Sequence, residues 1–223
     1  MHFKAPLIAG LAGLSTALST SNQPSKTSRS SPTLSTSKGF SIRLSVTDPS
    51  NNAGLDVSGQ YLSGARVGAG SYISVLSAAP GQAYYLNGTE PGTGTATQDI
   101  VGVYPISISI ADADTFDFSY PEEHDVGEDI GANSLFTVSE GNNPVLVGAG
   151  DAAGGQFAAC ERDFVFYGDE TTILTLRYVY GGEIVPMDCV PVELGLECAT
   201  LEDLPADAAW DHVSAQEVSC LLY

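Results

Sequence analysis

FSIRLSVT, which runs from Phe40 to Thr47, is the stretch of sequence that decides the fold. Its apolar residues alternate with polar ones and are Phe40, Ile42, Leu44 and Val46. Alternation with a period of two places such side chains on one face of an extended chain. The stretch therefore predicts a half-buried β-strand, which the turn-forming residues 48–52 bring to an end.

Similar short runs, rich in β-branched and aromatic residues, recur along the rest of the chain between clusters of Gly, Asn, Asp and Pro. Many short strands at this spacing predict a sandwich or a barrel. We expect an all-β fold, a single antiparallel β-sandwich of jelly-roll or immunoglobulin-like type over residues 39–223, with a disulfide-stapled C-terminal tail. The further predicted strands are 72–78, 83–87, 103–110, 135–139, 145–147, 156–160, 164–167, 173–180 and 190–194.

Three details of this pattern concern the last third of the chain. The runs 164–167 and 173–180 are joined by Gly168-Asp169-Glu170-Thr171-Thr172 and should pair as a hairpin. Residues 200–204 resemble a helical turn stopped by Pro205. Residues 210–220 fit a short helix or a last strand, and the pattern leaves both open.

The N-terminus has the profile of a signal peptide. Lys4 lies in a short basic stretch, residues 5–18 are mostly apolar, and small residues surround the expected cleavage site near Ser19. Residues 20–38 are almost entirely Ser, Thr, Pro, Asn and Gln with three basic residues, which predicts a disordered linker. We therefore expect residues 1–19 to be removed and the protein to be secreted.

The chain is strongly acidic, with a formal net charge of −19. Residues 39–223 hold all 27 acidic residues but only 4 of the 8 basic ones, which gives this segment a charge of −23. Phosphate backbones and anionic lipid headgroups are bound through clusters of Lys and Arg. We therefore expect no nucleic-acid partner, and no membrane insertion of the mature chain because no later segment is long and apolar enough.

The four cysteines fall in the last third of the chain and are Cys160, Cys189, Cys198 and Cys220. An even number in an exported chain predicts two disulfides, and no CxxC pair suggests zinc. Three pairings are open. We favour Cys160 with Cys189, which would flank a predicted hairpin, and Cys198 with Cys220, which would tie down the tail.

Local motifs provide one modification site and no catalytic set. Asn87-Gly88-Thr89 is an N-glycosylation sequon, so Asn87 is the expected acceptor. No Gly-x-Ser-x-Gly elbow and no HExxH motif is present. We expect His124 and His212 to be solvated loop residues. Asp112, Asp114 and Asp117 do not complete a calcium loop. With these motifs absent or incomplete, no catalytic residue, metal or cofactor is predicted.

Five segments resemble a family of small secreted fungal proteins of ascomycete type that is catalogued only as a domain of unknown function. They are FSIRLSVTDPS (40–50), VGAGSYISVL (67–76), YYLNGT (84–89), FAACE (157–161) and VPMDCVPVELGLECATLEDLP (185–205). The resemblance implies a secreted β-rich domain. It implies no catalytic residue, because no activity is established for the family.

These observations favour a secreted or cell-wall-associated non-enzymatic protein with an extracellular partner. One alternative is a module that binds carbohydrate or wall polysaccharide, which rests on analogy between folds. Another is a glycoside hydrolase active at acidic pH, which needs two carboxylates facing each other across a cleft. Neither alternative is selected by a motif of this sequence.

Overall fold

The computed structural model describes residues 31–50, 53–66, 71–100, 104–110, 126–129, 132–166 and 169–223. Its regular structure in these ranges is a set of fifteen strands with one 3-10 turn, Gly150–Ala152, so the all-β class is confirmed. The strands are β1 (Thr33–Ser37), β2 (Gly39–Val46), β3 (Tyr61–Arg66), β4 (Ser71–Ser77), β5 (Tyr84–Asn87), β6 (Thr93–Ile100), β7 (Tyr104–Ile110), β8 (Val126–Asp129), β9 (Phe136–Val138), β10 (Val145–Gly148), β11 (Gln156–Phe166), β12 (Asp169–Val179), β13 (Cys189–Ala199), β14 (Ala215–Gln216) and β15 (Val218–Leu222).

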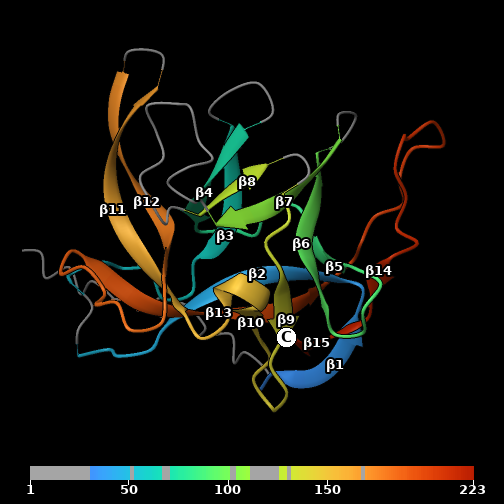
Figure 1. Ribbon diagram of the computed structural model, residues 1–223, viewed down its shortest axis with the longest axis horizontal. Coiled ribbons are helices and arrows are strands. Elements are labelled where there is room, and N and C mark those ends of the chain that lie inside the picture. Colours follow the sequence, from blue (N-terminus) through green and yellow to red (C-terminus); the bar gives the residue numbers. More distant parts are fainter. Residues whose placement is uncertain are drawn as a thin grey trace, which may run out of the picture. The chain divides into compact units, whose positions relative to one another are not determined.

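Strands β2 and β13 form the centre of the sheet. They are paired along eight consecutive positions, from Val46 opposite Val192 to Gly39 opposite Ala199. In Figure 1 they run across the view, with β11 and β12 to the left and β5 and β6 to the right. The alternation of β2 has the predicted effect, because Phe40, Ile42 and Leu44 are buried in the main apolar cluster.

The strand pairings close into two circuits that share β2 and β13. In the first circuit β2, β13, β10, β9, β6 and β5 are paired in turn, and β5 returns to β2. In the second circuit β13, β11, β12, β4, β3 and β2 are paired in turn. Among the described strands every pairing is antiparallel except that of β13 with β15.

The predicted sandwich of two separate sheets is therefore not what the pairings show, because all fifteen strands belong to one hydrogen-bonded sheet. Long strands make this continuity possible. β13 has 11 residues and pairs with β11 through its first part and with β2 through the rest. A strand that carries different partners along its length joins regions that would otherwise form two sheets.

The boundary of the predicted linker also needs correction. Residues 33–37, which fall inside the expected disordered segment 20–38, form β1 and pair with β15 from Thr33 opposite Leu222 to Ser37 opposite Val218. Backbone hydrogen bonds stabilise this strand, because Leu34 is its single apolar residue and is half exposed. The predicted signal peptide, residues 1–19, lies outside the described residues.

The predicted hairpin is confirmed, but its strands are longer than expected. β11 is continuous from Gln156 to Phe166 and pairs with β12 in register over its whole length (Figure 1). At the end of the chain, residues 200–204 form no helical turn, and residues 215–216 and 218–222 are strands. None of the described helical segments is long and apolar enough to cross a membrane.

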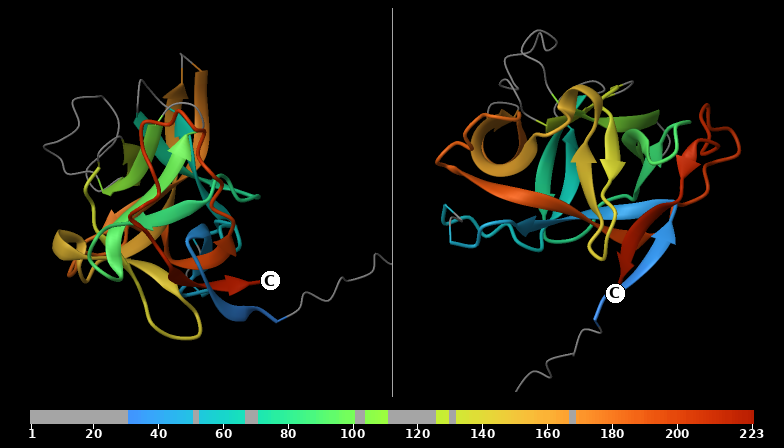
Figure 2. Two further views of the ribbon diagram at one scale, coloured as in Figure 1. Left: turned by 90° about the vertical axis from the view of Figure 1, so that its right-hand side faces the viewer. Right: turned by 60° about the horizontal axis from the view of Figure 1, so that its bottom comes forward.

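Two disulfides pair as favoured from the sequence. Cys160 bonds to Cys189, its direct cross-strand neighbour in the pairing of β11 with β13. Cys198 of β13 bonds to Cys220 of β15. The second bond lies beside the single parallel pairing, Glu197 with Leu221, and the right-hand view of Figure 2 shows β1 and β15 together at this corner.

Candidate functional site

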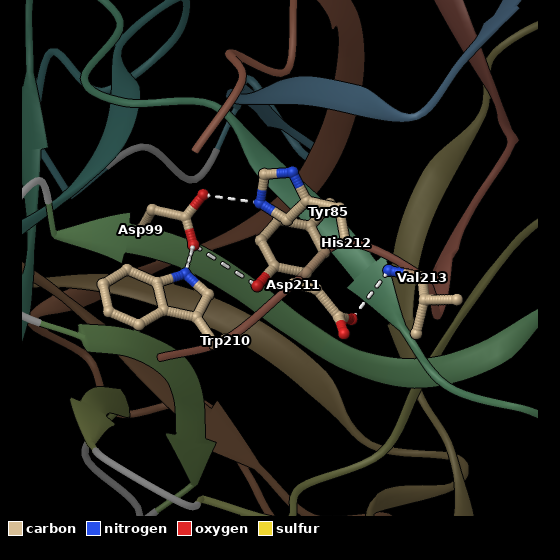
Figure 3. Close-up of polar contacts among 6 residues, drawn as sticks. All are labelled: Tyr85, Asp99, Trp210, Asp211, His212 and Val213. Carbon is tan, nitrogen blue, oxygen red and sulfur yellow. Dashed lines mark hydrogen bonds and ion pairs between the residues drawn. The ribbon is translucent and has the colours of Figure 1, made fainter. Parts of the chain in front are cut away.

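A cluster of polar and aromatic side chains surrounds Asp99, near the end of β6 (Figure 3). Tyr85 reaches it from the neighbouring strand β5, which pairs with β6 through Tyr85 and Thr97. Trp210 and His212 reach it from the loop that precedes β14. The pairing of β14 with β5 fixes the end of that segment next to the cluster.

Both oxygens of the Asp99 carboxylate are engaged inside the protein. Oδ1 accepts hydrogen bonds from Nε1 of Trp210 at 2.9 Å and from the hydroxyl of Tyr85 at 3.4 Å. Oδ2 lies 2.8 Å from Nε2 of His212, whose ring meets that of Tyr85 edge to face at 4.8 Å. The His212 and Asp99 side chains are only 18% and 15% exposed, so the bonds are partly shielded from water.

The electrostatics of the cluster favour a neutral tyrosine. Burial, followed by the charge and the hydrogen bond of Asp99, raises the pKa of Tyr85 well above its ordinary value. An ionised carboxylate accepts hydrogen bonds and cannot donate them, so Nε2 of His212 is the donor in that state. Asp99 thus orients the imidazole, the indole and the phenol together.

An aspartate that orients a histidine is also part of catalytic triads, in which the other ring nitrogen faces a hydroxyl nucleophile. Among the described residues, no serine or threonine hydroxyl is hydrogen bonded to His212. The described part of the chain also contains no group of three or more His, Cys, Asp or Glu side chains that could hold a metal ion. The cluster can therefore hold the rings of Tyr85, Trp210 and His212 in place, but within the described ranges no hydroxyl nucleophile is bonded to His212.

A second carboxylate, Glu128 of β8, is buried completely. Its Oε1 accepts a hydrogen bond from the hydroxyl of Tyr84 at 2.6 Å, and its Oε2 accepts one from Nε2 of Gln98. Gly64 makes room for it, because a Cβ at that position would lie 2.6 Å from Oε2. Burial raises the pKa of Glu128 to about 7, although both hydrogen bonds act in the opposite direction.

The predicted glycosylation site, Asn87, is half buried and is the last residue of β5, paired with Ala215 of β14. Gln216 holds the turn that follows it. Oε1 of Gln216 accepts a hydrogen bond from the backbone N–H of Gly92 at 2.7 Å. Its Nε2 lies 2.9 Å from three carbonyl oxygens, those of Gly88, Glu90 and Thr93.

The other residues singled out in the sequence have different outcomes. The expectation that His212 is a solvated loop residue is wrong, because Asp99 and Tyr85 cover most of its side chain. His124 and the three aspartates of the incomplete calcium loop, Asp112, Asp114 and Asp117, lie outside the described residues. Asp99, Tyr85 and Glu128 were missed because no spacing in the sequence links Asp99 with the distant Trp210 and His212, or Glu128 with its partners on other strands.

Replacing Asp99 by alanine should disturb the one tryptophan of the chain. In Asp99→Ala the indole N–H and the phenol lose their shared acceptor, which should lower the free energy of unfolding by about 1 to 3 kcal/mol. Because Trp210 is unique, its emission maximum reports this site alone and should shift to longer wavelength. Asp207→Ala, which removes an exposed acid of the same segment, is the control and should leave both quantities unchanged. An unchanged spectrum in Asp99→Ala would show that the carboxylate does not hold the indole.

Fold and site together define an acidic, disulfide-bonded all-β domain with an aromatic cluster fixed around one carboxylate. The chain belongs to the family described as "Domain of unknown function (DUF7907)", whose model matches residues 37–198. It is similar to the "Antigenic protein SchS34" of Stachybotrys chartarum, with 29% identity over 201 residues that cover 85% of this chain and 88% of the relative. No solved structure matches the chain.

Proposed function

We propose that this protein is a secreted, non-enzymatic protein of the fungal exterior that binds an extracellular partner, and that this partner is a cell-wall polysaccharide. The two disulfides support the proposal, because such bonds persist in oxidising compartments outside the cytosol. The name of the similar protein from Stachybotrys chartarum, an antigenic protein, is compatible with an extracellular location.

The observation that supports a non-enzymatic role is that Asp99 and Glu128, the two carboxylates described above, are both engaged inside the protein. Asp99 receives internal donors on both oxygens, and Glu128 is sealed from solvent. A general acid or base must reach the proton that it transfers, directly or through one water. Carboxylates occupied in this way support a role in holding neighbouring side chains, and they disfavour the alternative of an acid-pH glycoside hydrolase.

Export can be tested on the protein secreted by its native host. Enzymatic removal of N-glycans should lower the intact mass of the protein with its natural sequence. It should not change the mass of Asn87→Gln, because 87–89 is the one sequon of the chain. Asn142→Gln, which alters an exposed asparagine outside any sequon, should keep the mass change. Alkylation should add mass only after reduction, since all four cysteines are paired. Recovery from the cytosol alone, with four free thiols and no glycan, would overturn the proposal.

Association with the wall has a separate readout. Intact walls of the host, washed in high salt and then in a neutral detergent, should retain the protein if it binds polysaccharide through hydrogen bonds and ring contacts. Salt would release a protein held by charge alone, because exposed ionic contacts weaken as ionic strength rises. A protein found only in the culture medium, with none on the washed walls, would contradict the wall-associated role.

A further inference from the structure

A small pocket of about 180 Å³ opens where β2, β13 and β15 meet, away from the Asp99 cluster. Arg43 of β2 and Glu197 of β13 form its polar wall, with Nη1 and Oε1 3.2 Å apart. The hydroxyl of Tyr61 donates to the other oxygen of Glu197 at 2.8 Å, and Nε of Arg43 donates to the carbonyl of Gly59 at 3.4 Å. The two charged groups are thus held from both sides before any ligand arrives.

The charged side chains that line this pocket balance each other, which is unusual on so acidic a chain. Arg43 is one of only 4 basic residues beyond position 38, and Glu197, the single carboxylate side chain lining the pocket, neutralises it. An anionic ligand would meet the negative field of the whole domain. A cationic ligand would have to compete with Arg43 for Glu197. The balance favours a ligand without net charge.

The lining also offers polar groups that the protein does not use. Ser45, Ser58 and Asn143 line the pocket, and their side chains make no hydrogen bond to any described residue. Hydroxyls and an amide can both donate and accept, and the guanidinium and carboxylate add one strong donor and one strong acceptor. Such a mixture suits a ligand whose own groups both donate and accept, as sugar hydroxyls do.

An aromatic ring completes the pocket. Tyr223 is 51% exposed, and its ring lies beneath the Arg43 guanidinium, 5.8 Å from Cζ to the ring centroid. This cation–π contact orients the ring, which can offer apolar area to the C–H face of a sugar. At roughly 30 Å³ for each water, the pocket volume corresponds to about six water molecules. That volume suits one small ring rather than a long chain.

We propose that this pocket binds one neutral hexose residue, free or at an exposed position of a wall polysaccharide. The polysaccharide source rests on the proposed function, whereas the chemistry of recognition rests on the pocket alone. Arg43 and Glu197 bond to neighbouring hydroxyls of the sugar, Asn143 adds a third polar contact, and Tyr223 packs against the ring.

The test is calorimetric titration of the full secreted protein with laminarihexaose, chitohexaose, glucose and inorganic phosphate. We expect binding of at least one neutral sugar and none of phosphate. Asn143→Ala should weaken that binding roughly fivefold, as the loss of one hydrogen bond implies. Tyr223→Ala should weaken it roughly tenfold through the loss of ring contact. Asn142→Ala is the matched control, because its side chain is exposed but does not line the pocket.

Each outcome bears on one part of the proposal. Affinities that are equal in the unmodified protein, Asn143→Ala and Tyr223→Ala would place the sugar elsewhere and overturn the pocket assignment. Binding of phosphate alone, or of no probe, would overturn the ligand class. Oligosaccharide binding without glucose binding identifies the polysaccharide source, and equal binding identifies free sugar. If both variants are still retained on walls, the proposed function holds but this pocket is not the wall-binding site. If the protein binds sugar normally but is cytosolic, the pocket assignment holds but the proposed function is wrong.

Discussion

At pH 8 the Glu128→Gln variant should unfold with a free energy about 3 kcal/mol higher than that of the unmodified protein. Glu128 has a pKa of about 7 in the folded state and an ordinary value of 4.5. Each pH unit between these values corresponds to about 1.36 kcal/mol. Glutamine should keep the bond from Gln98, because its oxygen can accept, and its amide can donate to the Tyr84 oxygen in place of the bond that Tyr84 donates to Glu128.

The sign of the effect follows from where the proton is bound. Between pH 4.5 and 7 the folded protein holds a proton on Glu128 that the unfolded chain has released, so stability falls as pH rises through this window. Below pH 4.5 both states are protonated and the cost vanishes. Above pH 7 both are ionised and the burial of the charge costs its full amount. The advantage of Glu128→Gln should therefore grow with pH and level off above 7.

Chemical denaturation at several pH values between 4 and 8 measures this difference. Glu193→Gln is the matched control, because Glu193 is an exposed glutamate on β13. It accounts for the general gain that an acidic chain obtains from the loss of one charge. If the two variants gained equally at pH 8, or if the advantage of Glu128→Gln did not change with pH, the buried carboxyl would not be the group that titrates.

Loss of the disulfide between Cys198 and Cys220 should release one corner of the sheet. The bond closes a separation of 22 residues, for which the chain-entropy relation gives about 3 kcal/mol. Cys220 is fully buried, so the double change Cys198→Ala and Cys220→Ala avoids placing a hydroxyl there. Guanidinium denaturation should show the loss, and hydrogen exchange should show faster exchange in β1 and β15.

The double change Cys160→Ala and Cys189→Ala provides the comparison. This bond spans a similar separation, 29 residues, and its removal should cost a similar free energy. However, it joins residues that β11 and β13 already pair, so exchange in β1 and β15 should stay slow. Equal exchange at that corner in both double variants would show that the disulfide of Cys198 is not what secures it.

Strands with a simple alternation of apolar residues could be predicted from the sequence, whereas β6 and β8 could not. β2 and β12 were expected because apolar residues recur at every second position. β6 was missed because its buried positions are Gly94, Ala96, Thr97 and Gln98, which no hydrophobic pattern reveals. In β8 the buried polar group is Glu128, whose partners Tyr84 and Gln98 come from other strands. Hydrogen bonds between distant residues stabilise these strands, and a local pattern does not report them.

The same reason limits what the sequence says about the site. The cysteines and the sequon were found because each is recognisable on its own. Asp99 and His212 become meaningful only when β5, β6 and the segment before β14 come together. A resemblance to secreted fungal proteins of unknown function had no catalytic residues to transfer, and the family match leaves that unchanged.

Strand β1 and the turn after Asn87 both depend on residues near the C-terminus, and this affects the order of events during biosynthesis. β1 finds its partner only when residues 218–222 exist, and the turn after Asn87 closes only when Gln216 is present. While the ribosome is still adding the intervening residues, the turn after Asn87 cannot close, so a glycosyltransferase can bind the sequon. Once the last strands have formed, the side-chain amide of Gln216 holds the same turn, accepting from Gly92 and donating to the carbonyl oxygens around it. We therefore expect any sugar on Asn87 to be attached before the sheet closes.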